Sequence, residues 1–184
     1  FAAPARQAPA ADGHEIRAVV TPPERPRTRS RSTLLPSPVK KAATELGLTV
    51  LQPARPSQPK FLDTLGDLQP DLGVVVAYGH ILRPALLAIP KLGLVNVHAS
   101  LLPRWRGAAP IHWAVMSGDS ETGVSIMQIE AGLDTRGTWL KRSLPIGPTH
   151  TTRQLFQLLA ELGAAARLPT LPRTEPGGGP EPRG

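Results

Sequence analysis

The chain has 184 residues with no Cys, 22 Pro, 17 Gly and a formal net charge of +7. The absence of Cys excludes disulfides, thiolate metal ligands and Cys nucleophiles, and no apolar run reaches the roughly 18–20 residues that a membrane-spanning helix needs. The positive charge favours a polyanionic partner, with nucleic acid first. The N-terminus lacks the basic and apolar segments of a signal peptide, and together with the absence of Cys this favours a cytoplasmic protein.

The first half of the chain alternates short apolar strands with helices. Ser37 is a helix N-cap followed by Pro38, and Gly47 can end that helix. Its apolar face is expected to contain Val39, Ala42, Ala43 and Leu46. In chain order, we expect a strand at 15–21, a Pro- and Arg-rich loop at 21–36, a helix at 37–47, a strand at 48–53 and a helix at 61–68.

The second half holds the most apolar segments. Residues 72–79, LGVVVAYG, are typical of a strand that is buried on both faces of a parallel sheet. The Pro- and Gly-rich tail beyond residue 164 is expected to be disordered. The other expected elements are a strand at 92–98, a helix at 110–118, two pairing strands at 122–130 and 138–146, and an amphipathic helix at 151–163.

This alternation of strands and helices predicts an α/β domain with a mainly parallel sheet. No strand sequence precedes residue 15, although doubly wound sheets usually begin with a central strand. The chain also does not begin with Met. We therefore expect it to lack its first strand and to be incomplete at its N-terminus.

Two polar side chains end the predicted strand at 92–98. Asn96 and His98 are two residues apart and share one face of the strand, while Val95 and Val97 share the other. Ligands of open α/β sheets bind at the carboxyl ends of such strands. An amide that never ionises and an imidazole that exchanges a proton near neutral pH suit acyl transfer, in which an oxyanion is stabilised and a proton is moved.

Such a site needs a carboxylate that orients the His98 imidazole or relays its proton. Asp134 lies in a Gly-containing turn, EAGLDTRG, that can fold back over the crevice, and Glu130 and Asp119 are competing candidates. A strand-end Asn or His taken alone is more often a structural group than a catalyst, so the residues by themselves leave acyl transfer as one hypothesis. The other His residues show no metal-ligand spacing.

Residues 96–135, NVHASLLPRWRGAAPIHWAVMSGDSETGVSIMQIEAGLDT, resemble the core of the methionyl-tRNA formyltransferases. SPVK, VVVAYGHIL and TPPERP resemble further parts of these enzymes, and the similarity runs from about residue 14 to residue 163. A wider family of 10-formyltetrahydrofolate-dependent transferases shares the Asn-x-His…Asp arrangement and SLLP. RWRGAAPI and SPVK are typical of the tRNA-directed branch.

The resemblance implies a Rossmann-like formyltransferase domain at residues 1–163. A disordered tail or linker would follow at 164–184, and the family's C-terminal barrel domain would be absent. The implied reaction moves a formyl group from 10-formyltetrahydrofolate to the α-amine of methionyl initiator tRNA, for translation initiation, without a metal. Asn96 and His98 would hold the oxyanion, and Asp134 would orient His98 and help to remove the amine proton. The expected enzyme is a cytoplasmic monomer with no membrane partner, and the chain alone, without its first strand, is expected to be inactive.

The resemblance also assigns binding residues. The folate would be bound by Ser100, Leu101, Leu102 and Pro103 of SLLP, by the turn from Ala131 to Asp134, and by Tyr78, His80, Ile81 and Leu82. The tRNA would be bound by Arg25, Arg27, Arg29 and Arg31 in the loop at 21–36, and by Arg104 and Arg106 at its acceptor end. The sequence departs from the family at Thr28, where Gly is expected, and at Arg136, which precedes Gly137.

Two alternative functions remain open at this point. A folate-dependent formyltransferase that acts on a small amine or a sugar nucleotide would not need the Arg-rich loop or SPVK. A non-catalytic, basic RNA-binding fragment would bind RNA with a steep salt dependence and would be indifferent to folate.

Overall fold

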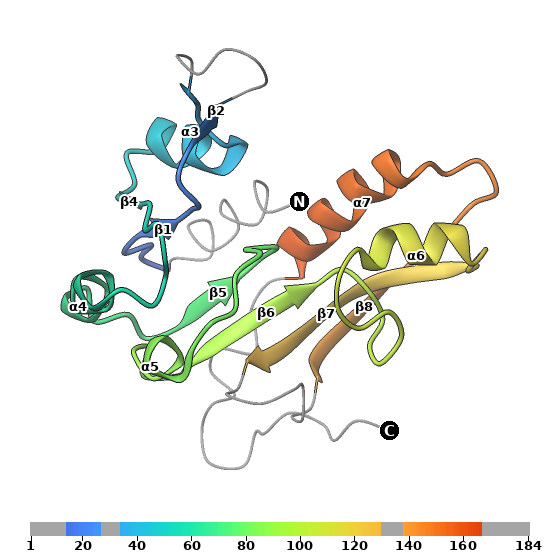
Figure 1. Cartoon of the computed structure of the whole chain (residues 1–184). Coiled ribbons are helices and arrows are strands. Elements are labelled where there is room, and N and C mark those ends of the chain that lie inside the picture. Colours follow the sequence, from blue (N-terminus) through green and yellow to red (C-terminus); the bar gives the residue numbers. More distant parts are fainter. Residues whose placement is uncertain (1–13, 27–33, 130–137, 167–184) are drawn as a thin grey trace.

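The computed structural model describes residues 14–26, 34–129 and 138–166 (Figure 1). The strands form a four-stranded sheet in the order β5-β6-β7-β8 and two separate pairs, β1-β4 and β2-β3. In chain order the elements are β1 (Val19–Val20), β2 (Arg25–Pro26), β3 (Leu34–Leu35), α3 (Pro38–Glu45), β4 (Val50–Leu51), α4 (Pro59–Asp67), β5 (Gly73–Val75), α5 (Pro84–Leu87), β6 (Leu94–His98), α6 (Pro110–Met116), β7 (Glu121–Ile129), β8 (Thr138–Pro145) and α7 (Thr152–Ala165).

The α/β class is confirmed, but the described sheet is mixed and not mainly parallel. β5 runs parallel to β6, and β1 runs parallel to β4. β7 runs antiparallel to both β6 and β8, and the predicted pairing of the strands at 122–130 and 138–146 is confirmed. Only residues 130–137 separate β7 from β8, fewer than the dozen or more that a crossover between parallel strands needs, so these two strands pair antiparallel.

Helices cover both faces of the four-stranded sheet, and α6 and α7 lie together on one of them (Figure 1). The apolar cluster on that face contains Val97, Ala99, Ile111, Val124, Leu155 and Leu159. The cluster on the opposite face contains Phe61 of α4, Leu86 of α5 and Leu94 of β6, with Val20 of β1 and Leu51 of β4 packed against it. The β1-β4 pair is therefore joined to the main sheet through side-chain packing.

Capping side chains determine where α3 and α7 begin. Ser37 caps α3 by accepting a hydrogen bond from the Lys40 amide, and Thr151 and Gln154 form a capping box at the start of α7. The expected apolar face of α3 is confirmed at Ala43, which is fully buried, but is wrong at Leu46, which is 49% exposed. Leu46 is the C-cap residue, where the chain leaves the helix and the helical periodicity no longer applies.

Several expected strands are shorter than their apolar runs. The run at 72–79 forms only the three residues of β5, and the expectation of burial on both faces is wrong for Val74, which is 42% exposed. The expected loop at 21–36 contains the antiparallel pair of β2 and β3. α7 ends at Ala165, so the tail proposed at 164–184 is wrong at its first two residues, which are helical. Residues 167–184 of that tail lie outside the described residues.

None of the helices in the described ranges is long and apolar enough to cross a membrane.

Candidate active site

Asn96 and His98 project from the same face of β6, as the sequence predicts. Both are half-buried, whereas Val95 and Val97 on the other face are 5% and 6% exposed. Val75 of parallel β5 is in register with Asn96, so the carboxyl ends of the two strands meet at this edge of the sheet. Among the described residues no hydrogen bond engages the Asn96 amide, which leaves its donor and acceptor open to a ligand.

The His98 ring is held by the loop that follows β6. Its Nε2 lies 3.0 Å from the carbonyl oxygen of Trp105. A carbonyl only accepts hydrogen bonds, so Nε2 carries the proton and donates it to Trp105. In the neutral ring Nδ1 is then a free proton acceptor, and in the imidazolium Nδ1–H is a donor. The loop therefore fixes which ring nitrogen is available for chemistry.

Ser125 of β7, a residue that sequence reasoning missed, holds this loop in place. It is fully buried and stands opposite His98 in the β6–β7 register. Its hydroxyl donates to the Ser100 carbonyl at 2.7 Å and accepts from the Leu102 amide at 3.0 Å. The sequence signal for this role was a Ser among the apolar residues of TGVSIMQIE, because a buried hydroxyl needs hydrogen-bond partners.

The SLLP residues divide into buried and accessible positions. Ser100 is fully buried and donates to the Arg104 carbonyl at 2.6 Å, and Leu102 is 3% exposed. Pro103 is exposed, and half-buried Leu101 lines a hollow of about 260 Å³ with Arg104, Trp105 and residues 119–122. Ser100 and Leu102 thus shape the loop, and their predicted contact with folate stays a prediction.

The other predicted folate residues leave β5 at the same edge of the sheet. Tyr78 and His80 contact each other with ring centroids 5.2 Å apart, Leu82 is half-buried and Ile81 is 90% exposed. The Tyr78 hydroxyl is buried and has no hydrogen-bond partner in the described part of the chain. Burial raises the pKa of the Tyr78 phenol, so it stays a neutral donor available to a ligand.

The predicted catalytic carboxylate, Asp134, lies outside the described residues, as does its competitor Glu130. Ile129 at the end of β7 pairs with Leu94, which is four residues, or about 13 Å, from His98. Five residues from Ile129 to Asp134 span at most about 17 Å. A chain that folds back over this face of β6 is therefore long enough to bring the carboxylate to the imidazole.

The third candidate carboxylate, Asp119, is engaged elsewhere. It accepts two hydrogen bonds from the Arg104 guanidinium, at 2.6 and 3.0 Å, and a third from Trp105 Nε1 at 2.7 Å. Arg104, predicted to bind an RNA phosphate, is therefore already paired with a carboxylate. Arg106 is exposed and forms no ion pair with any other described residue.

The hydrogen bonds from Arg104, with a smaller contribution from Trp105, lower the pKa of Asp119 below its ordinary value of 3.8. A lowered folded-state pKa means that the stabilising contribution is fully present above pH 3.8 and is lost as the pH falls through the lowered pKa. We expect Asp119→Asn to reduce the free energy of unfolding near neutral pH, and this deficit to shrink as the pH approaches about 3. Urea unfolding of both proteins across that range measures it. A deficit independent of pH would contradict the ion-pair assignment.

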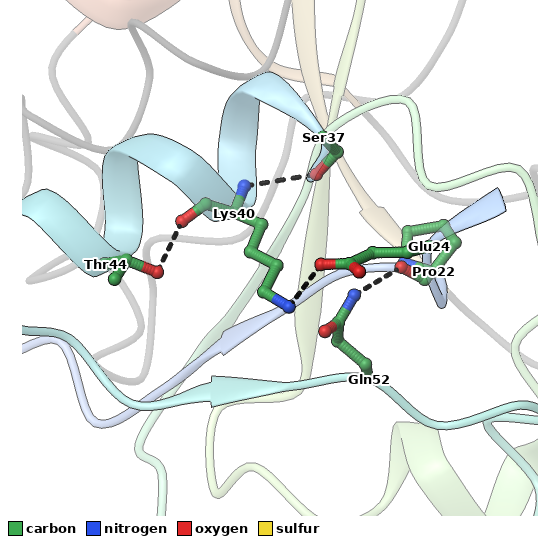
Figure 2. A network of polar contacts seen from close by, with 6 residues as sticks. All are labelled: Pro22, Glu24, Ser37, Lys40, Thr44 and Gln52. Atoms are coloured by element: carbon green, nitrogen blue, oxygen red, sulfur yellow. Dashed lines mark hydrogen bonds and ion pairs between the residues drawn. The ribbon is translucent and has the colours of Figure 1, made fainter. Parts of the chain in front are cut away.

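The base of the Arg-rich loop at 21–36, here called the Arg loop, is anchored on α3 and β4. Lys40 Nζ forms an ion pair with Glu24, and the two side chains are 28% and 21% exposed. The Gln52 amide donates to the Pro22 carbonyl at 3.0 Å, and Figure 2 shows both contacts side by side. SPVK and TPPERP, separate motifs in the sequence, are therefore one physical unit. Arg25 begins β2, whereas Arg27, Arg29 and Arg31 lie outside the described residues.

Comparison with known proteins places this arrangement in a family. The formyl transferase family matches residues 3–171. Methionyl-tRNA formyltransferase of Geotalea uraniireducens (strain Rf4) is 47% identical over 171 residues, which are 93% of this chain and 54% of that protein. The corresponding protein of Stenotrophomonas maltophilia (strain K279a) is 57% identical over 155 residues, which are 84% of this chain and 50% of that protein.

Solved structures agree with the sequence comparisons on the fold. A phosphoribosylglycinamide formyltransferase from Bacillus halodurans superposes with a TM-score of 0.72 at 20% identity, covering 89% of this chain and 82% of that one. This confirms the Rossmann-like formyltransferase fold. The chain spans about half the length of the curated relatives named above. With the family match extending over most of its residues, the chain belongs to the formyl transferase family.

Proposed function

We propose that this chain carries the catalytic unit that moves a formyl group from 10-formyltetrahydrofolate to the α-amine of methionyl initiator tRNA. The observation that supports it most is Asn96 and His98 on one face at the end of β6, in a chain 47–57% identical to proteins named methionyl-tRNA formyltransferase. The Arg loop, anchored by Lys40 and Glu24, supports an RNA substrate. We further propose that the enzyme acts as a monomer in the cytoplasm.

The folate supplies an N-formyl group with a carbonyl carbon open to attack. The amine of the substrate attacks that carbon, and the Asn96 amide N–H donates to the oxygen as negative charge develops there. His98, with Nε2 bound to Trp105, faces the reaction with Nδ1. As a neutral ring it accepts the amine proton at Nδ1, and the resulting imidazolium donates Nδ1–H first to the oxyanion and then to N10 of the folate. The carbonyl re-forms as the bond between N10 and the formyl carbon breaks, so tetrahydrofolate leaves with that proton. Asp134 completes the site by pairing with the protonated ring.

The residues present suit the pterin of the folate. The buried Tyr78 hydroxyl, which has no hydrogen-bond partner within 14–26, 34–129 and 138–166, and the 90% exposed Ile81 both lie in the segment that leaves β5 beside Asn96. An unpaired polar group together with an uncovered apolar side chain is typical of a ligand site. Among the described residues, no cluster of three His, Asp or Glu side chains is placed to hold a metal ion.

Formyl transfer from labelled 10-formyltetrahydrofolate, measured on this chain extended at both ends to the length of its relatives, tests the proposal with three acceptors: methionyl initiator tRNA, glycinamide ribonucleotide and an amino-sugar nucleotide. The proposal predicts label in the tRNA alone. Label in either small acceptor in preference to the tRNA would establish the alternative of a small-molecule formyltransferase. RNA binding without transfer of label in any arm would leave only the RNA-binding alternative.

Replacing Lys40 by Met is expected to raise the KM for methionyl-tRNA about 3- to 10-fold, because Glu24 loses its partner and the base of the Arg loop is no longer fixed. The KM for folate is expected to stay unchanged. Lys41→Met is the matched control, since it removes the same charge from an exposed side chain with only a 4.0 Å contact to Glu45. Equal effects of the two substitutions would show that charge alone, and not the anchor, matters.

A further inference from the structure

We propose that Arg104, Trp105 and Trp113, here called the tryptophan platform, bind one unpaired nucleotide of the acceptor RNA by stacking, next to the active site. The inference deepens the proposed function and rests on it for the identity of the RNA. The contacts that support it lie in the loop after β6 and on the exposed side of α6, and they do not depend on the proposed function.

The platform consists of two nearly parallel aromatic rings and a guanidinium group over one of them. The rings of Trp105 and Trp113 have centroids 6.0 Å apart and planes inclined by 13°. The guanidinium carbon of Arg104 lies 4.5 Å from the centroid of the Trp105 ring. Proteins recognise single-stranded nucleic acid by stacking its bases on such aromatic rings and guanidinium planes.

The platform is rigid before any ligand arrives. Asp119 holds both Arg104 and Trp105 by hydrogen bonds. Trp105 and Ala109 have φ angles of 58° and 55°, a left-handed conformation that a non-Gly residue adopts only when its surroundings impose it. A surface that is already ordered loses little conformational entropy on binding, which favours affinity.

The side of α6 that carries Trp113 is open to solvent, and a hollow lies next to Arg104 and Trp105. Trp113 is 49% exposed and Met116, one turn further along α6, is 76% exposed. The hollow bordered by Arg104 and Trp105 contains Thr122, whose buried hydroxyl has no hydrogen-bond partner among the described residues. Arg106, which forms no ion pair with any other residue that the structure describes, adds a positive charge beside this apolar surface. This combination suits a nucleotide better than an uncharged apolar ligand.

The charge pattern points to a base as the bound group, and not to a phosphate at Arg104. Both carboxylate oxygens of Asp119 are bonded to the Arg104 guanidinium, so its charge is locally neutralised while its plane remains. Within the described ranges Arg106 has no carboxylate partner, so its charge is available for a phosphate. A base stacked on the rings with its phosphate toward Arg106 matches both features.

The platform is connected to the catalytic histidine through a single residue. Trp105 accepts the hydrogen bond of His98 through its carbonyl and carries one ring of the platform in its side chain. An aminoacyl group is attached to the 3′ end of its RNA, so the nucleotides nearest the reacting amine must pass this loop. Stacking one of them here would place the amine at His98.

A matched pair of substitutions tests the platform. Trp113→Leu keeps apolar bulk on α6 but removes the ring, whereas Trp113→Phe keeps a ring. Phe156→Ala removes an aromatic side chain of similar exposure, 39%, from α7 and serves as the control. Binding of a fluorescent, single-stranded RNA ending in CCA is measured by anisotropy at about 50 and about 200 mM salt. Circular dichroism checks that each variant is folded.

We expect Trp113→Leu to raise the Kd for this RNA about tenfold, equal to about 1.4 kcal/mol, and Trp113→Phe and Phe156→Ala to stay within about threefold. The tenfold ratio should persist at the higher salt, because stacking releases no counterions. A folded Trp113→Leu protein with wild-type Kd overturns the platform. If Trp113→Leu does not fold, Trp113→Phe takes its place in the test. A rise of about tenfold in the Kd of Trp113→Phe would contradict the platform, because the Phe ring can still stack on a base.

A formylation assay on the same substitutions, made in the chain extended at both ends to the length of its relatives, separates this inference from the proposed function. If the wild type transfers the formyl group and Trp113→Leu has an unchanged KM for tRNA, the platform is contradicted and the proposed function is supported. If RNA binding depends on Trp113 but the wild type transfers no formyl group, the platform is supported and the proposed function is contradicted.

Discussion

Replacing Asn96 by Ala is expected to lower kcat for formyl transfer by about 10²- to 10³-fold, the loss that follows removal of one oxyanion donor. The free energy of unfolding should stay within about 1 kcal/mol of the wild type. The Asn96 amide makes no hydrogen bond to a described residue, so its removal leaves no unsatisfied partner in that part of the chain. Single-turnover kinetics with bound folate measure the chemical step, and urea unfolding measures stability.

Asn96→Asp provides the control for the donor. Aspartate keeps the size of the side chain but replaces the amide N–H with a negative charge beside the developing oxyanion. We expect it to be at least as slow as Asn96→Ala. Recovery of activity in Asn96→Asp would assign Asn96 a structural role and remove it from the chemistry.

Gly123→Ala is expected to lower stability by about 1–3 kcal/mol, and by more if β7 and β8 must separate. A Cβ at Gly123 would lie 2.1 Å from the Arg142 carbonyl oxygen of β8 and 2.5 Å from Leu101 Cδ2. The carbonyl belongs to the paired strand and cannot move aside without breaking the register. A protein of this length should lose roughly 2–4 °C of Tm per kcal/mol, which thermal unfolding measures directly.

Gly66→Ala is the matched control for that substitution. Gly66 lies in α4, and a Cβ added there would have no heavy atom within 4 Å outside its own helix backbone and chain neighbours. Ala is favoured over Gly in helices, so this change should leave stability unchanged or raise it by up to about 1 kcal/mol. Equal losses in the two variants would mean that the close approach at Gly123 has no special effect.

The face of β6 that carries Asn96 and His98 could be predicted from residue alternation alone. Strand period places Asn96 and His98 together whatever the surroundings, and their half-burial beside buried Val95 and Val97 confirms it. The caps of α3 and α7 were equally predictable, because the side chains that satisfy the helix ends are local in sequence. These features depend on neighbours within a few residues.

Features that depend on distant partners could not be predicted in this way. Ser125 holds the SLLP loop from a strand 23–25 residues further along the chain, and Asp119 pairs with Arg104 over 15 residues. From its charge alone, Arg104 was predicted to bind a phosphate, but in the structure this charge is paired with Asp119. Likewise Val74 is an apolar residue in an apolar run, and only its place on the short strand β5 exposes it.

The account depends most on Asp134 acting together with His98, and a double-mutant cycle in kcat tests this directly. If Asp134 works by orienting and pairing with the His98 imidazole, each single substitution to Ala should lower kcat by about 10²- to 10⁴-fold. The double variant should then be little slower than His98→Ala alone, because a carboxylate without its imidazole has nothing to orient. Multiplicative losses in the double variant would show that the two side chains act independently and would contradict the proposed site.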